Sequence, residues 1–197
     1  MELSEIIASR RSIRKFKGKD VSEETIRILL DAARLAPSGS NLQPWRFVVV
    51  RSPEARNSLQ AATVFRFALK APVVIACCSD FSSLEGRPER MLELFQAGVF
   101  DNVEVDGEYV PPDRNRDQLG AYLNMNVGIA ITHMMLKAVD LGLGTCWIGG
   151  FDSVKAKEIL GLEDPLQVVA LLPIGYPAKV PAARPRFDLG KLIVKTI

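Results

Sequence analysis

The sequence predicts a globular domain that combines α-helices with a few buried β-strands. Its 197 residues are 48% hydrophobic and 24% charged, which is typical of folded domains and argues against extensive disorder. An amphipathic helical pattern follows Ser22, and residues 72–78 form an apolar run like that of a strand covered on both faces. A chain of this length buries about 70% of the surface of its unfolded form. We therefore expect one domain over residues 1–197, which needs no disulfide or structural metal to fold.

The first elements are predicted by local signals. Residues 2–9 can form a short helix with an apolar face. Ser22 is a suitable N-cap for a second helix, because its hydroxyl can accept a backbone N–H and two glutamates follow in the first turn. Pro37 ends that helix, and residues 37–41 indicate a loop.

The middle of the chain is predicted to alternate strands and helices. Residues 45–50 and 72–78 are expected to be strands, and residues 53–70 between them a helix. Residues 80–117 have a mixed charge pattern with scattered prolines and glycines, which indicates an excursion with a helix near residues 88–98.

The last third is predicted to contain a long helix and a final strand. Residues 119–141 are apolar but interrupted by polar side chains, which favours a buried helix ending at Gly142 over a membrane span. A short helix over residues 152–160 and a strand over residues 166–174 follow. The apolar tail at residues 189–197 is expected to dock as a strand or arm rather than hang free.

Positive charge gathers at the two ends of the chain. Residues 1–19 carry six basic residues against two acidic ones, and residues 173–197 carry five against one. The middle sums to −6, which leaves an overall net charge of +2. This distribution indicates either one anion site built from both termini or solvated surface charge. Nucleic-acid binding is disfavoured, because the chain contains no recognised nucleic-acid-binding module.

Cysteine and histidine usage argues against a metal site. Cys77, Cys78 and Cys146 form no Cys-x-x-Cys motif, and the single His133 cannot complete a Cys/His zinc site. His133 is better interpreted as a core residue of the long helix, and a bridge between Cys77 and Cys78 is disfavoured. Because the first residues are amphipathic rather than a signal-peptide run, we expect a reduced, cytoplasmic protein without a membrane anchor.

Several common catalytic motifs are missing. The sequence contains no Gly-x-Ser-x-Gly elbow and no phosphate-binding Walker loop. Residues 142–147 nearly match Gly-x-Gly-x-x-Gly, but Trp147 stands in place of the third glycine and the segment follows a helix rather than a strand. A dinucleotide-binding fingerprint is therefore not predicted.

Four other segments carry chemistry. Residues 10–14 place three arginines within five residues, and guanidinium groups suit phosphate oxygens. Residues 37–45 offer hydroxyl and amide side chains on a loop, and glycines in residues 142–150 allow close approach of a flat ligand. Residues 184–186 add two further arginines. Together these segments predict a large ligand with an anionic group, a polyol and a planar ring.

The same segments, in this order, resemble the FMN-dependent nitroreductase family. The matching motifs are Arg-Arg-Ser-x-Arg at residues 10–14, Ala-Pro-Ser-x-x-Asn-x-Gln-Pro-Trp at 36–45, Gly-Leu-Gly-x-Cys-Trp-Ile-Gly at 142–149, and Ile-Gly-Tyr-Pro at 174–177 before Arg-Pro-Arg. The resemblance covers nearly the whole chain. It implies an α+β fold with a mixed, mainly antiparallel central sheet flanked by helices. It also implies a homodimer with two FMN molecules at the subunit interface.

The resemblance also implies roles for individual residues. Arg10, with Arg184 and Arg186, is expected near the phosphate, and Arg14 near flavin N1 and the C2 carbonyl. The loop residues are expected to reach the flavin of the other subunit. The full expected cofactor-binding set is Arg10, Arg11, Ser12, Arg14, Pro37, Ser38, Asn41, Gln43, Ile148, Gly149, Gly150, Arg184 and Arg186. Gly149 and Asn126 depart from the family, which more often has acidic residues there. Asn126 is interpreted as structural.

The expected activity is transfer of a hydride from NADH or NADPH, through FMN, to a small acceptor such as a nitroaromatic or a quinone, by a ping-pong mechanism. No side chain is expected to act as general acid or base, because the flavin carries the chemistry. The 80–117 excursion is expected to cover the flavin and shape substrate choice. Related flavoproteins that dehalogenate substrates or break down flavin remain alternatives, as does an FMN-binding module without turnover.

Overall fold

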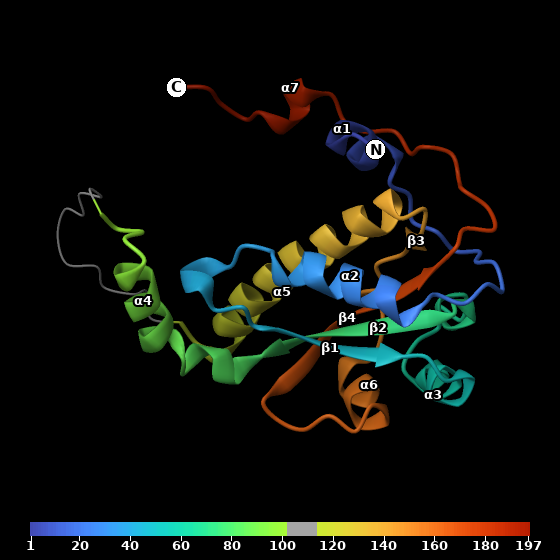
Figure 1. The fold of residues 1–197 in the computed structure, drawn as a ribbon, viewed down its shortest axis with the longest axis horizontal. Helices are drawn as coiled ribbons and strands as arrows, with labels where there is room; N and C mark the ends of the chain where they lie inside the picture. The colour runs from blue at the N-terminus through green and yellow to red at the C-terminus, as the bar shows by residue number, and fades with distance from the viewer. Residues whose placement is uncertain (102–113) are drawn as a thin grey trace.

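A four-stranded antiparallel sheet forms the centre of the molecule (Figure 1). The computed structural model describes residues 1–101 and 114–197, so part of the expected 80–117 excursion lies outside the described residues. The strands are β1 (Trp45–Val50), β2 (Val73–Asp80), β3 (Gly144–Thr145) and β4 (Leu166–Gly175), in the order β1-β2-β4-β3. The sheet therefore has β2 and β4 in its interior and the two-residue β3 at one edge.

Helices cover both faces of this sheet. One core cluster joins α2 (Glu23–Arg34) and α5 (Arg116–Asp140) to one face, and a second joins α6 (Ser153–Ile159) and residues 59–69 to the other (Figure 1). The remaining described helices are α1 (Leu3–Ser9), α3 (Pro53–Ser58), α4 (Arg87–Gln96) and α7 (Leu189–Leu192). This arrangement is the α+β architecture that the resemblance implies.

Strand β2 is covered on both faces, as its uninterrupted run of apolar residues predicted. Val73, Ile75 and Cys77 belong to the core under α2 and α5. The intervening Val74, Ala76 and Cys78 belong to the core on the α6 side. Alternate side chains of a strand point to opposite faces, so burial on both faces requires apolar residues at every position. The three cysteines of the chain are free.

The predicted N-cap of α2 is confirmed. The Ser22 hydroxyl accepts a hydrogen bond from the Thr25 backbone N–H at 3.2 Å, and Glu23 and Glu24 occupy the first turn. Ile26, Leu29 and Ala33 form its buried stripe.

Helix α5 is fixed at both ends by local interactions. Asn115 Oδ1 accepts the Gln118 N–H at 2.9 Å, while Gln118 Oε1 accepts the Asn115 N–H at 3.0 Å, which is a capping box. At the other end Gly142 takes a φ of +72°, a left-handed conformation that glycine adopts at low energetic cost. No helix in the described ranges has the length and apolar content needed to cross a bilayer.

Two local expectations were wrong. Residues 53–70 do not form one helix: α3 ends at Ser58, and short 3-10 turns follow at Leu59–Ala61 and Ala68–Lys70. His133 lies on α5 but is only partly buried. The C-terminal tail forms the single helical turn α7, and its side chains are exposed in the single chain. Strand β3 had not been predicted.

Candidate functional site

The arginine segment at the start of the chain lies beside the edge strand β3. The Ile13 N–H donates a hydrogen bond to the Thr145 carbonyl oxygen at 2.8 Å, and Ser12 pairs with Thr145 in a parallel bridge. A Cβ atom on Gly144 would overlap the Ile13 side chain. The glycine therefore allows the close approach that places residues 10–14 beside the glycine-rich residues 144–150.

The chain that follows β4, which carries the basic C-terminal residues, begins at the same β3 edge of the sheet. The Lys17 N–H donates to the Tyr176 carbonyl at 2.8 Å, and the Ala178 N–H donates to the Lys15 carbonyl at 2.9 Å. These two hydrogen bonds hold the chain after β4 alongside the N-terminal segment. The structure thus brings the two basic ends of the sequence together.

Cys146 lies beside the arginine segment. Burial raises the pKa of the Cys146 thiol, and the positive charges of Arg14, Arg10 and Arg184 partly oppose this rise. Arg14 also lines the pocket that contains Cys146, and Ser12 pairs with Thr145, the residue before Cys146.

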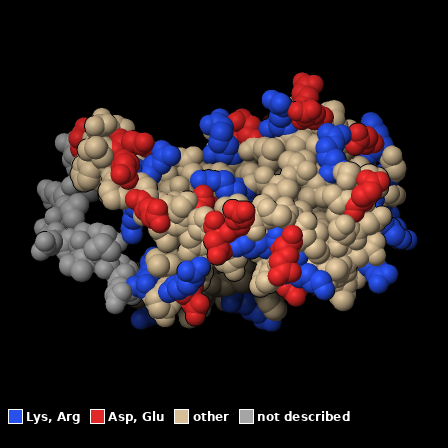
Figure 2. Space-filling model, turned by 90° about the horizontal axis from the view of Figure 1, so that it is seen from below, with Lys and Arg blue, Asp and Glu red and all other residues tan. Residues whose placement is uncertain are grey.

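None of the residues 10, 11, 14, 184 and 186 forms an ion pair with a carboxylate of the described residues, whereas Arg27, Arg34, Arg46, Arg51 and Arg90 each do. Arg56, Arg66, Arg87, Arg114 and Arg116 also have no such pair, so the distinguishing feature of the first group is that its segments run side by side at one edge of the sheet. On the face seen in Figure 2, basic and acidic side chains are interspersed. Clustered guanidinium groups without carboxylates favour an anionic ligand.

Three of the predicted arginines donate to backbone carbonyls, among them Arg14, whose Nη1 donates to the Ser12 carbonyl at 3.3 Å. Arg11 Nη1 donates to the Ala8 carbonyl at 2.6 Å and to the Arg10 carbonyl at 2.9 Å. Arg11 thus satisfies carbonyl groups at the end of α1, a common role of basic side chains at a helix C-terminus. Arg186 Nη1 donates to the Pro185 carbonyl at 3.1 Å, and its side chain stays exposed.

The glycine segment lines a small pocket beside the arginines. The pocket has a volume of about 200 Å³ and is lined by Arg14, Phe65, Phe67, Cys146, Trp147, Ile148, Gly149 and Gly150. A Cβ atom on Gly150 would lie 2.9 Å from the Phe65 ring. The absence of a side chain at Gly150 therefore keeps this wall open.

Phe65 and Phe67 were not among the predicted site residues. Their rings meet edge to face with centroids 6.1 Å apart, and the Arg14 guanidinium lies 5.9 Å from the Phe67 centroid. The signal that could have found them is the Phe-Arg-Phe pattern of residues 65–67, because alternate aromatic residues are unusual on a helix surface and more typical of an extended segment with one face against a ligand or core.

The second group of predicted residues lies on the loop after α2. Ser40, Asn41 and Gln43 have φ values of 51°, 49° and 48°, and such left-handed conformations cost non-glycine residues about 1–3 kcal/mol each. Ser38 Oγ accepts the Gln43 N–H at 3.0 Å, and Gln43 Nε2 donates to Asn41 Oδ1 at 3.1 Å. The loop is thus a defined but strained unit.

Within a single chain the arginine segment 10–14 and the loop 37–43 lie apart. The arginine segment precedes α2 and the loop follows it, and a helix of 12 residues is about 18 Å long. Figure 1 shows the two segments at opposite ends of α2. A surface cavity of about 530 Å³ between α5 and α6 is lined by none of the predicted residues.

Comparisons with known proteins show the family of the chain. The model of the nitroreductase family matches residues 7–176. The chain belongs to the nitroreductase family. A relative from Thermus thermophilus, described as an NADH dehydrogenase, is 31% identical over 94% of this chain and 91% of its own length.

Solved structures give the same result. A nitroreductase-family protein from Streptococcus pneumoniae covers 99% of this chain and 100% of its own with a TM-score of 0.78 and 27% identity. A protein from Exiguobacterium sibiricum, solved in complex with FMN, covers 100% of this chain and 98% of its own with a TM-score of 0.81 and 25% identity. The predicted family and α+β fold class are confirmed, and the chain is an enzyme of the oxidoreductase class.

Proposed function

We propose that this nitroreductase-family enzyme binds FMN and transfers a hydride from NADH or NADPH, through FMN, to a small acceptor such as a nitroaromatic or a quinone. The observation that carries the proposal is that backbone hydrogen bonds place the arginine segment 10–14 and the chain after β4 side by side at the β3 edge. Arg14 there lines a pocket with the open wall at Gly149–Gly150. Donor and acceptor use one pocket in turn, which gives ping-pong kinetics.

The residues present fit FMN. Unpaired guanidinium groups suit the terminal phosphate, which has two negative charges, and the chain has no pyrophosphate-binding glycine loop that would favour FAD. Among the described residues, the backbone N–H groups of Gly149 and Gly150 have no protein acceptor, so they are available to a planar heterocycle. A pocket of about 200 Å³ is smaller than the roughly 300–1,000 Å³ typical of sites for ligands of this size. Further walls are therefore needed.

Each part of the cluster has a distinct task. Arg10 and Arg184 hold the phosphate, with Arg186 at its exposed side. Arg14 lies over the Phe67 ring and sets a fixed positive charge on the pocket wall, which favours negative charge on a bound ring. When bound, FMN supplies the hydride chemistry, so the protein needs no general acid or base.

A homodimer supplies the missing walls. In this proposal Pro37, Ser38, Asn41 and Gln43 of one subunit complete the pocket formed by the arginines of the other, and residues 1–197 act as one FMN-binding domain. Large apolar side chains are exposed on α1 and on the C-terminal tail, at Leu3, Ile7, Phe187, Leu189, Leu192, Val194 and Ile197. Such surfaces favour a partner. A cytoplasmic location belongs to the same proposal.

The test begins with the cofactor. The purified full-length protein is denatured and the released compound is separated by chromatography, and FMN is the expected product. FAD alone, or no flavin after reconstitution, would contradict the proposal. NADH or NADPH oxidation is then measured at several quinone concentrations, where parallel double-reciprocal lines are expected and intersecting lines would indicate two separate pockets.

A further inference from the structure

Two residues one turn apart on α5 contact the loop of residues 37–43. Asn126 is 1% exposed, and its Oδ1 accepts the Gly39 N–H at 2.9 Å. Its Nδ2 donates to the Tyr122 carbonyl at 2.7 Å. The side-chain amide of Asn126 therefore links the loop backbone to the helix backbone through one acceptor and one donor.

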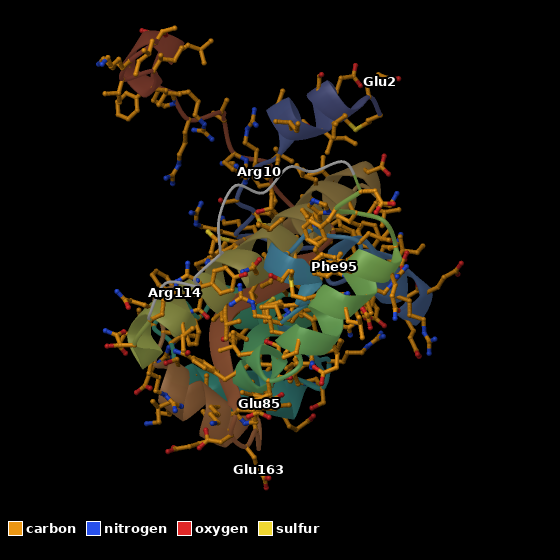
Figure 3. All side chains as sticks on the ribbon, turned by 90° about the vertical axis from the view of Figure 1, so that its left-hand side faces the viewer. Glu2, Arg10, Glu85, Phe95, Arg114 and Glu163 are labelled. Carbon is orange, nitrogen blue, oxygen red and sulfur yellow. The ribbon has the colours of Figure 1, made fainter. Side chains whose placement is uncertain are left out.

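The Tyr122 side chain restricts the position of the same loop by packing against its backbone. A Cβ atom on Gly39 would overlap the Tyr122 hydroxyl and lie 3.0 Å from Cζ, so the loop backbone lies directly against this ring. The Arg114 guanidinium also lies over the ring, 4.8 Å from its centroid. Figure 3 shows Arg114 beside the first turns of α5 and Phe95 on the neighbouring α4.

The loop needs such support. Ser40, Asn41 and Gln43 adopt left-handed conformations that an unsupported chain rarely populates. The hydrogen bonds from Gln43 to Ser38 and Asn41 lie within the loop and cannot fix its place relative to the helices. The contacts from Asn126 and Tyr122 can.

We propose that Asn126 and Tyr122 are positioning residues that hold the 37–43 loop in its binding conformation and so determine how tightly FMN is held. The inference rests on the proposed function, in which this loop completes the FMN pocket of the partner subunit. A loop already ordered before binding loses less conformational entropy when the ligand arrives, which raises affinity without a new contact.

The first experiment compares two asparagines of the same helix. FMN is titrated into the full-length apoprotein carrying Asn126→Ala or Asn124→Ala, at a temperature where circular dichroism shows both variants folded. Asn124 is the matched control, because its Oδ1 has no partner among the described residues. The dissociation constant is expected to rise about tenfold or more for Asn126→Ala and to stay within about twofold of wild type for Asn124→Ala. Equal constants for both variants would overturn the inference.

A second experiment does not depend on the Asn126 variant folding. Gly39→Ala places a methyl group against the Tyr122 hydroxyl, and Tyr122→Phe removes that hydroxyl. Gly39→Ala alone is expected to weaken FMN binding about tenfold, and the double variant to recover to within about threefold of wild type. A merely structural role would lower the unfolding midpoint without coupling the two changes in FMN affinity, so additive effects would contradict the inference.

The two proposals fail in different ways. A wild-type protein that does not bind FMN would refute the proposed function. A wild-type protein that binds FMN, together with variants that bind it equally well, would refute only the positioning role of Asn126 and Tyr122.

Discussion

The backbone N–H of Ile13 donates to the carbonyl oxygen of Thr145 at 2.8 Å, and this contact attaches the arginine-bearing segment to the edge of the sheet. The approach is possible because residue 144, next along β3, has no side chain. Both the position of the arginines of the proposed FMN site and the stability of this edge therefore depend on a glycine that has no reactive or binding side chain.

Gly144→Ala is expected to destabilise the protein and to weaken FMN binding. The new methyl group would overlap the Ile13 side chain, and overpacking of this kind costs about 1–3 kcal/mol. Urea unfolding measures the loss. Gly18→Ala is the matched control, because a Cβ atom there meets nothing within 4 Å. Equal unfolding free energies for the two variants would show that the contact between Ile13 and β3 is not tight.

Removal of a clustered arginine is expected to weaken FMN binding. Charge-assisted hydrogen bonds contribute about 1.5–3 kcal/mol each, so Arg10→Ala, Arg184→Ala and Arg186→Ala should each raise the dissociation constant roughly tenfold to a hundredfold. Fluorescence titration with FMN checks this. Lys17→Ala serves as comparison, because Lys17 is an exposed cation of the same segment outside the predicted set. Unchanged affinity in all three arginine variants would identify them as ordinary surface charges.

Stability is expected to fall at high pH through Cys78. Burial raises the pKa of the Cys78 thiol from 9.0 to about 11. Above pH 9 the unfolded chain releases this proton while the folded chain keeps it, so the unfolded state binds fewer protons and folding stability decreases with pH. A contribution of roughly 3 kcal/mol is present below pH 9 and is lost as pH rises to about 11.

Urea unfolding between pH 8 and pH 11 tests this pH dependence. The fall in unfolding free energy should be smaller in Cys78→Ala than in wild type. Val74→Ala is the control, because it also shortens a buried side chain of β2 on the same face but removes no titratable group. A Cys78→Ala variant that loses as much stability as Val74→Ala over this range would disprove the assignment.

Two different defective subunits are expected to complement one another. If each site combines Arg10 of one subunit with Asn41 of the other, a mixed dimer of Arg10→Ala and Asn41→Ala chains contains one intact site and one site with both changes. An equal mixture after subunit exchange should then show about one quarter of its sites with wild-type FMN affinity, because half of the dimers are mixed. No recovery of tight sites, or an active FMN-loaded monomer in sedimentation, would refute the shared site.

The sequence predicted correctly those elements that depend on interactions between residues close together in the chain, or on an unbroken run of apolar residues. The Ser22 cap and the apolar run of β2 act within a few residues, and both are confirmed. The helix expected over residues 53–70 failed because tertiary contacts prevail there. The Thr63 hydroxyl donates to the Gly150 carbonyl at 3.3 Å, and the Asp152 N–H donates to the Ala62 carbonyl at 2.8 Å. Strand β3 has only two residues, too few for any periodic pattern.

The sequence predicted only part of the candidate site, because motifs show which segments belong together but not the tertiary contacts of each side chain. Motif order and charge at the two ends predicted that residues 10–14 and 184–186 share a site, and the structure runs the chain after β4 alongside residues 15–17. The motif could not show that the Arg11 side chain turns toward the end of α1. That orientation arises because Arg11 donates a hydrogen bond to the Ala8 carbonyl in the last turn of the helix. The structural interpretation of Asn126 agrees with its burial, but its partner Gly39 is distant in sequence.

The contrast between a buried interior strand and a two-residue edge strand has a consequence for hydrogen exchange. Residues of β2 are buried on both faces, so we expect their amides to exchange only when the whole domain unfolds, and those of Ile13 and β3 to exchange through local opening of the edge. The arginine segment should then be able to separate from the sheet while the core stays closed. We therefore expect the protein to stay folded without FMN and to bind FMN without a cycle of denaturation.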